Sequence, residues 1–163
     1  MPVHEAQEHR VIAEGYSLLY GIASQQRNVD KILIVKSASQ SVHSLITEIA
    51  NYTTSLSKQL EDFAAKYPAL RVDVQFLPEV EVKARAAIAS ECIKELLLTS
   101  GKNFERLLLH SQLDALQQES HIAAVMVDLE VDARRAFWVD THKRLDVLHD
   151  KVARLLEDQC RGG

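Results

Sequence analysis

The feature that most constrains the fold is one apolar stripe from about Val29 to Tyr67. Its apolar residues recur in steps of three and four, the spacing of one face of an α-helix. The members are Ile32, Val35, Ala38, Val42, Ile46, Ile49, Thr53, Leu56, Leu60, Phe63 and Tyr67. No Gly or Pro interrupts the stripe, Asn28 or Asp30 is a suitable N-cap, and Pro68 follows its end. A helix of this length spans about 55–60 Å, so other long helices must cover it.

The segments on either side of this stripe supply further elements. A first helix is predicted from about Val3 to Gln26, in which Gly15 and Gly21 would each cost about 1 kcal/mol relative to Ala but would let another helix approach closely. Between Pro68 and Pro78, apolar and polar residues alternate in the pattern of a strand. Because such a strand would have no partner, we expect an extended crossover over about residues 67–78.

The second half of the chain reads as further long helices. A helix is predicted from Glu79; Gly101 either ends it, with Asn103 capping the next helix, or only kinks it. A single helix from Phe104 to Glu157 would span about 80 Å, so we expect a turn at 128–132 with Asp132 as cap. One stripe of the helix before this turn contains Phe104, Leu107, Leu108, Ser111, Ala115, Ile122, Val125 and Leu129; a second face contains Leu109, Leu113, Leu116 and Ala123. The last helix presents Phe137, Thr141, Leu145, Leu148, Val152 and Leu155.

Composition excludes several classes of protein. The net charge of −4 argues against a general nucleic-acid binder, which needs a basic face. No apolar run reaches about 18 residues, so no membrane span is expected. The N-terminal residues lack the pattern of a signal peptide, which predicts a cytoplasmic protein. Cys92 and Cys160 are too few and too far apart for a disulfide framework or a thiolate metal site.

A short motif in the second half resembles a known family. Leu98-Thr99-Ser100-Gly101-Lys102-Asn103-Phe104-Glu105 resembles a Leu-x-Ser-Gly-x-x-Phe-Asp signature in bacterial ferritin-like four-helix bundles of unassigned function, usually exported. The resemblance covers about residues 30–155. It implies an all-α, ferritin-like up-and-down four-helix bundle. The length of the chain predicts one domain, residues 1–163, and its last residues predict a frayed tail at 159–163. The family's two typical histidines are absent here: Thr53 and Thr54 occupy the first region, and Leu116 stands twelve residues after Phe104.

Metal-ligating residues are present, but not in the ferritin-like arrangement. A di-iron bundle uses a Glu on each of two helices and Glu-x-x-His on each of the other two. The nearest forms here are Asp146-x-x-His149 and Glu48-x-x-Asn51, which Glu14 and Asp128 would complete. Asp146 lies about 140° from the apolar stripe of its helix at 100° per residue. A solvated carboxylate therefore explains it better than a metal ligand does.

Two other groups of histidines are candidate ligands. At the N-terminus, His4, Glu5, Glu8 and His9 pair at helical spacing and would suit a divalent metal, although a solvated face is the simpler interpretation. His142, Asp146 and His149 form a row on the last helix. Its two histidines are about 10 Å apart, too far to share a metal unless Asp146 lies between them as a ligand.

The sequence contains no pattern for catalysis. Ser17, Ser111 and Cys92 have no base signalled beside them, and there is no phosphate-binding loop. We therefore expect a non-catalytic helical module without a cofactor, acting through self-association or a protein partner. The alternative is a degenerate ferritin-like binder of a metal, cofactor or small ligand. If the protein dimerises, the expected contacts are Leu109, Leu113 and Leu116, flanked by Trp138, because a second apolar face must find cover.

Overall fold

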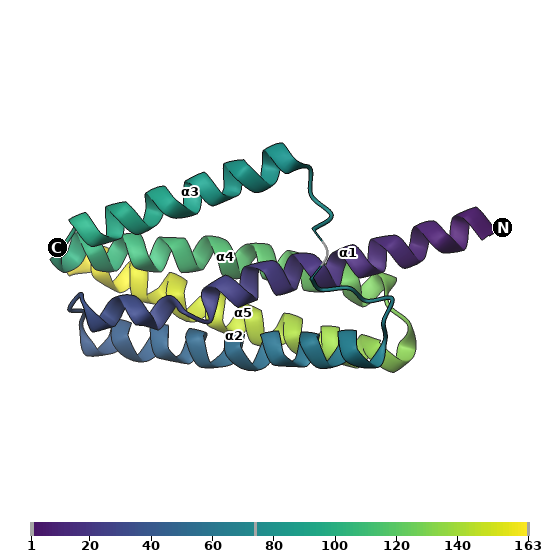
Figure 1. Cartoon of the computed structure of the whole chain (residues 1–163). Helices are drawn as coiled ribbons and strands as arrows, with labels where there is room; N and C mark the ends of the chain where they lie inside the picture. The colour runs from purple at the N-terminus through teal and green to yellow at the C-terminus, as the bar shows by residue number, and fades with distance from the viewer. Residues whose placement is uncertain (1, 74, 163) are drawn as a thin grey trace.

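Antiparallel helices account for the whole architecture of the part of the chain that the structure describes, residues 2–73 and 75–162 of a computed structural model (Figure 1). The elements are α1 (Pro2–Gln26), the 3-10 helix η1 (Val29–Ile34), α2 (Gln40–Lys66), α3 (Glu79–Leu98), α4 (Gly101–Leu129) and α5 (Asp132–Arg161). The predicted all-α class is confirmed. The number of long helices is five rather than four, because the chain reverses direction at Gly101 instead of kinking.

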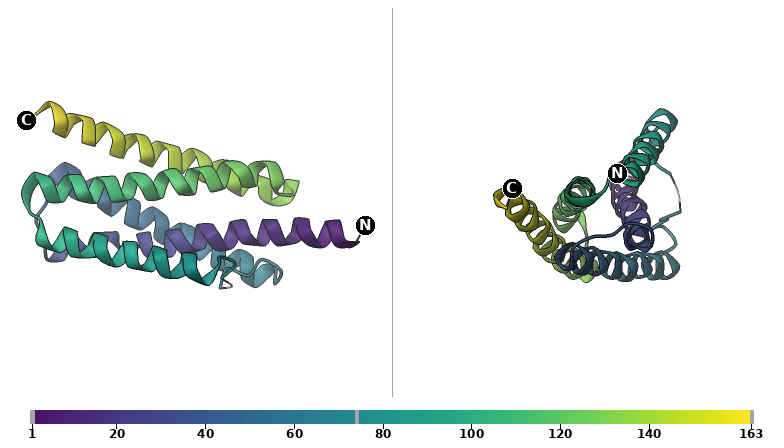
Figure 2. Two further views of the ribbon diagram at one scale, coloured as in Figure 1. Left: turned by 90° about the horizontal axis from the view of Figure 1, so that it is seen from above. Right: turned by 90° about the vertical axis from the view of Figure 1, so that its left-hand side faces the viewer.

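Contacts join α1, α2, α4 and α5 into one packed group, and α3 contributes little to it. Figure 2 shows α1, α2, α4 and α5 packed side by side, whereas α3 diverges from them toward its N-terminal end. The α4–α5 hairpin makes the most extensive helix–helix contact in the molecule, and α3 touches α4 mainly near their shared turn. The connection at 67–78 has no strand among its described residues, and Val74 of the predicted alternation lies outside them. No described helix is both long and apolar enough to cross a bilayer.

The predicted 39-residue helix is broken near its start, which corrects the sequence interpretation. Residues 35–39 are non-helical, and α2 begins only after Ser39, whose hydroxyl accepts a hydrogen bond from the Val42 N–H at 3.4 Å. The Ser39 N–H in turn donates to Oε1 of Glu105 on α4 at 2.5 Å. Asn28 makes no capping bond. Serine is more favourable at an N-cap than inside a helix. The hydrogen bond from Ser39 to Glu105 further stabilises the break at this position.

The other turns fall close to their predicted positions, but with different caps. Gly101 is the first residue of α4 and has φ +61, a conformation that glycine adopts without steric cost. Ser100, not Asn103, occupies the N-cap position. The turn at 128–132 is confirmed, with Val131 in the N-cap position and Asp132 as the first residue of α5. Helix α5 continues to Arg161, so the tail predicted to fray from 159 is mostly helical.

The core follows the predicted stripe over α2. Ile49 and Leu60 are fully buried, as expected for the middle of the α2 stripe. Gly15 lies where a Cβ would come within 2.1 Å of the Met126 sulfur on α4. The close approach predicted for that glycine is therefore confirmed. Around Gly21 a Cβ would meet nothing within 4 Å, so the close helix approach predicted for Gly21 is not found among the described residues.

Helix α4 is buried on its second face along most of its length and on its first stripe only near its start. Leu109 and Leu116 of the second face are completely buried, and so are Phe104 and Leu108 of the first stripe, whereas Val125 and Leu129 of the first stripe are exposed. Trp138 is also completely buried, and Leu113 is half-buried. The predicted dimer contact through these four residues is therefore wrong, because the chain itself covers that face.

Candidate functional site

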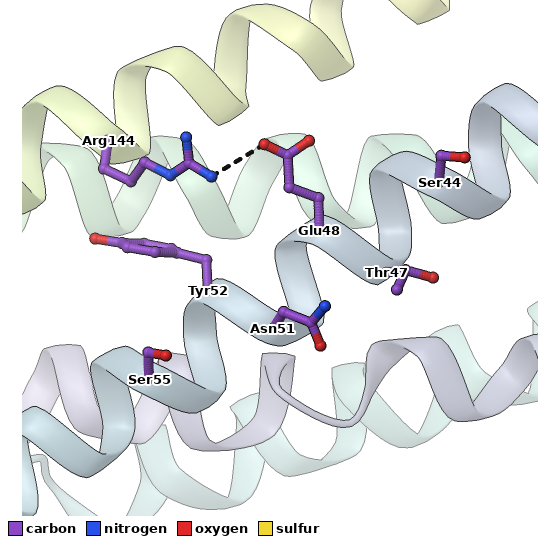
Figure 3. A pocket seen from close by; sticks show the side chains of 7 residues that line it. All are labelled: Ser44, Thr47, Glu48, Asn51, Tyr52, Ser55 and Arg144. Carbon is purple, nitrogen blue, oxygen red and sulfur yellow. Dashed lines mark hydrogen bonds and ion pairs between the residues drawn. The ribbon is translucent and has the colours of Figure 1, made fainter.

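Glu48, a predicted metal ligand, instead joins α2 to α5. Its Oε1 accepts hydrogen bonds from Arg144 Nη2 at 3.0 Å and from Lys151 Nζ at 2.9 Å. Figure 3 shows the Glu48–Arg144 pair at the edge of a shallow groove of about 440 Å³. The other groove residues are mostly hydroxyl- or amide-bearing; they are Ser44, Thr47, Asn51, Tyr52 and Ser55. Because two cations already lie beside it, Glu48 acts as an ion-pair link between α2 and α5.

The other central candidates lie apart from Glu48 and from one another. Glu14 accepts from Arg10 Nε at 3.0 Å on its own helix. Asp146 accepts from the Ser120 hydroxyl and lies 3.4 Å from His142 Nε2. His149 Nδ1 is 3.8 Å from Asp150, and Asp128 is exposed near the end of α4. The described residues contain no group of three or more His, Cys, Asp or Glu placed to hold a metal ion.

The N-terminal candidates lie on an exposed extension of α1. His4, Glu5, Glu8 and His9 are all exposed, and Figure 1 shows this part of the helix projecting beyond the bundle. Among the described residues, these four side chains belong to no group of three or more that could hold a metal ion. This cluster therefore has the geometry of a solvated helix end.

Sequence reasoning missed Glu119, a glutamate in the middle of α4. Its side chain is 0% exposed, and neither carboxyl oxygen has a hydrogen-bond partner among the described residues. Burial alone raises the pKa of this carboxyl to about 8, so it is mainly protonated at neutral pH. Buried polar groups are nearly always hydrogen-bonded, and a perturbed carboxyl in an interior marks a candidate site. Its position three residues after Leu116 on the second apolar face was the available signal.

Tyr52 lines the surface groove, and the nearby Glu119 carboxyl affects its pKa. Burial raises the pKa of Tyr52 to about 12; a hydrogen bond with Thr141 opposes the rise and the nearby Glu119 carboxyl adds to it. The Arg144 guanidinium lies 5.6 Å from the centre of the Tyr52 ring on the groove side. Tyr52 therefore lies near both the groove and the Glu119 carboxyl.

A second buried glutamate, Glu130, is fully partnered. Its carboxylate accepts from Tyr16 Oη at 2.5 Å, from Arg134 Nη2 at 2.7 Å and from the Val131 N–H at 2.9 Å. Burial raises the pKa of Glu130, but these bonds outweigh it and hold the pKa below its ordinary value. Trp138 packs edge-on against Tyr16, with ring centroids 5.0 Å apart. This cluster joins α1 to the α4–α5 turn.

One end of the molecule leaves apolar side chains uncovered. We define the end patch as Ile34, Val35, Leu97 and Leu98, whose exposed fractions are 83%, 68%, 49% and 86%. Lys36 Nζ donates to the Leu97 carbonyl at 3.1 Å, which brings the two segments together. Beyond the patch, α3 buries only Leu96 among its described residues and exposes Val80, Ile88 and Ile93. The end patch and α3 therefore expose seven large apolar side chains among the described residues.

The chain matches no protein-family model, no curated protein and no solved structure at a significant level.

Proposed function

We propose that the protein is a non-catalytic helical-bundle module that acts through self-association or a protein partner, with the end patch and α3 as its contact surface. The exposure of Ile34, Val35, Leu97 and Leu98 carries this proposal. Monomers rarely expose large contiguous apolar patches, and each square ångström of apolar surface removed from water contributes about 25 cal/mol. The proposal includes a cytoplasmic location, no cofactor and no nucleic-acid partner, in keeping with the net charge of −4.

A homodimer through this surface has a simple geometry. In a twofold interface the same patch on each copy contacts the other. The end patch lies where η1, α3 and the start of α4 meet, away from the projecting N-terminal end of α1. Two copies could therefore join end to end without moving the bundle helices. This arrangement replaces the buried Leu109–Leu116 face as the proposed interface.

Light scattering at micromolar concentration tests the proposal. We expect a dimer mass for the native chain and a monomer mass for the double variant Ile34→Lys and Leu98→Lys. Val3→Lys is the matched control, because Val3 is 78% exposed at the opposite end. A monomer mass for the native chain contradicts self-association, and a dimer that survives the double variant contradicts this interface.

Glu119 favours a second candidate, a degenerate ferritin-like binder of a metal, cofactor or small ligand. Ferritin-like bundles place their sites on inward-facing carboxylates between helices, and Glu119 is a buried carboxyl with no hydrogen-bond partner among the described residues. Protein dialysed against Fe(II) or Zn(II) and analysed for metal separates the two proposals. We expect less than one equivalent in the native chain. A stoichiometric ion that is lost in Glu119→Gln would favour the second candidate.

A further inference from the structure

One side of α3 faces the rest of the chain along most of the helix. Leu96 is buried, and Cys92, Ala89, Arg85 and Val82 are half-buried, whereas the residues between them are exposed. These five positions follow one another in steps of three and four, the spacing of one helix face. We call them the inner face of α3, and four of the five are apolar.

Contact beneath the inner face is concentrated at one end. α3 touches α4 mainly near their shared turn, and Figures 1 and 2 show α3 diverging from the bundle toward its N-terminal end. At that end Lys83 Nζ lies 2.8 Å from Glu79 Oε1 within α3. Arg85 Nη2 likewise lies 2.8 Å from Glu81 Oε1. Segments with few buried apolar contacts move at a low cost in free energy, and the N-terminal half of α3 can shift without breaking either ion pair.

A groove of about 270 Å³ separates this half of α3 from α1. Val82 and Ala86 line the groove from α3, and Leu18 and Ile22 line it from α1. Leu18 and Ile22 are four residues apart, so they share one side of their helix. The two walls therefore present apolar side chains to each other, and removing such surface from water favours contact between them.

The polar side chains around the groove do not oppose this contact. Gln25, Asp73 and Gln75 are exposed. The Arg85 side chain is 41% exposed and already paired with Glu81. Contact between the apolar walls therefore need not bury an unpaired charge, which would be costly.

The C-terminal end of α3 provides a pivot. Only Thr99 and Ser100 separate α3 from α4, and Gly101 begins α4 with φ +61. Hinges are a few loop or element-terminal residues that absorb changes in φ and ψ. The helix between Leu96 and Val82 is about 21 Å long, so a rotation of about 10° at this turn moves Val82 by about 4 Å.

We propose that α3 is a hinged flap, which pivots at the turn after Leu98 and closes the groove by packing Val82 and Ala86 on Leu18 and Ile22. The structure shows the open position. Burial of the facing apolar walls favours the closed position, and ordering of the crossover opposes it. Val80 lies on the outward side of α3 and the end patch lies at the pivot, so both stay exposed in either position. The proposal is therefore independent of self-association.

Distances between two spin labels on the full chain test the proposal. The labels are placed at Ala84→Cys on α3 and Gln59→Cys on α2, with the native cysteines replaced as Cys92→Ala and Cys160→Ser. Dilution with unlabelled chain keeps every distance within one copy, even in a dimer. We expect two distances, the second shorter by about 3 Å or more, the thickness of one layer of water. Moving the first label to Glu95→Cys, near the pivot, is the matched control and should give one distance.

Two lysine variants identify the contact that closes the flap. Val82→Lys places a charge in the closed contact and should abolish the shorter distance. Val80→Lys adds the same charge to the outward side, where Val80 is 81% exposed, and should leave both distances. Circular dichroism confirms that each variant is folded.

Three results would overturn the proposal. The first is a single distance, of either length, between the labels at Ala84→Cys and Gln59→Cys, because α3 would then have one position. The second is a pair of distances unchanged in Val82→Lys, since the closed position would not depend on the groove walls. The third is an equal loss of the shorter distance in Val82→Lys and Val80→Lys, which would show an effect of net charge alone.

Discussion

Glu119 lies on α4 and Glu130 just after its end, and both carboxyls are buried. Their surroundings differ in the hydrogen-bond partners that they offer. Glu130 has Tyr16, Arg134 and the Val131 N–H around it, and its pKa is lowered. Glu119 has no hydrogen-bond partner among the described residues, and its pKa is raised to about 8. Burial raises the pKa in both places. The partners therefore decide whether a buried carboxyl is a charged structural link or a neutral group open to a ligand.

Removing Arg134, the cation beside Glu130, should make the two carboxyls more alike. It should have the largest effect on stability of the changes considered. Arg134→Met leaves Glu130 buried, with Tyr16 and one backbone N–H as its remaining partners. An unpaired buried charge costs about 3–5 kcal/mol, so the denaturant midpoint should fall accordingly. Arg10→Met is the control, because Arg10 is exposed and pairs with Glu14 on its own helix. An unchanged midpoint in Arg134→Met would show that Tyr16 and the backbone suffice.

Apolar core residues calibrate the size of these effects. Ile49→Ala and Leu60→Ala each remove a fully buried side chain from the α2 stripe. Such truncations cost about 2–5 kcal/mol, measured by chemical denaturation. If either variant matches the native midpoint, that residue does not lie at the centre of the packed seam.

The contributions of Glu119 and Glu130 to stability should change with pH in opposite directions. The folded pKa of Glu119 lies above its ordinary value of 4.5. Its contribution to stability is therefore present below about pH 4.5 and is lost as pH rises to about 8, with a slope of up to about 1.4 kcal/mol per pH unit. Glu130 has a lowered pKa, so its contribution is present above 4.5 and is lost on acidification.

Glu119→Gln isolates the first of these slopes. The amide keeps the size of the side chain but does not titrate, so the loss of stability between pH 4.5 and 8 should flatten in urea titrations of this variant. Glu130→Gln should leave that slope unchanged and remove part of the acid sensitivity instead. Equal slopes in the native chain and Glu119→Gln would mean that Glu119 is charged and partnered in solution.

Gly15 and Gly21 of α1 offer a second comparison of two surroundings. Substitutions there should have the smallest effect on stability. Gly21→Ala should raise stability by up to about 1 kcal/mol, since nothing occupies the space of the new methyl group. Gly15→Ala should lower stability, because the buried Met126 side chain must move. Thermal melts of the two variants check both signs. Two changes in the same direction would show that helix propensity alone governs these positions.

The local sequence pattern predicted where most helices lie and where some of them begin or end. The bounds of α1, the end of α2 before Pro68, the start of α3 at Glu79 and the turn at 128–132 all follow from periodicity and from Gly and Pro. These signals are sufficient because helix formation and termination depend on residues within a few positions of one another. The all-α class follows from them, whereas the count of helices required knowing that Gly101 reverses the chain.

Tertiary structure decided what local patterns leave open. The predicted long helix is interrupted just before α2, where Glu105, distant in sequence, accepts the N–H of the N-cap residue Ser39. Both faces of α4 are apolar, so only the packing of α1 and α5 against it determined that Leu109 and Leu116 turn inward. Glu119 lies on that same inward face, and its burial could not be recognised until the face was known. Periodicity identifies which residues share a face, but the free energy of burial depends on the neighbours that cover it.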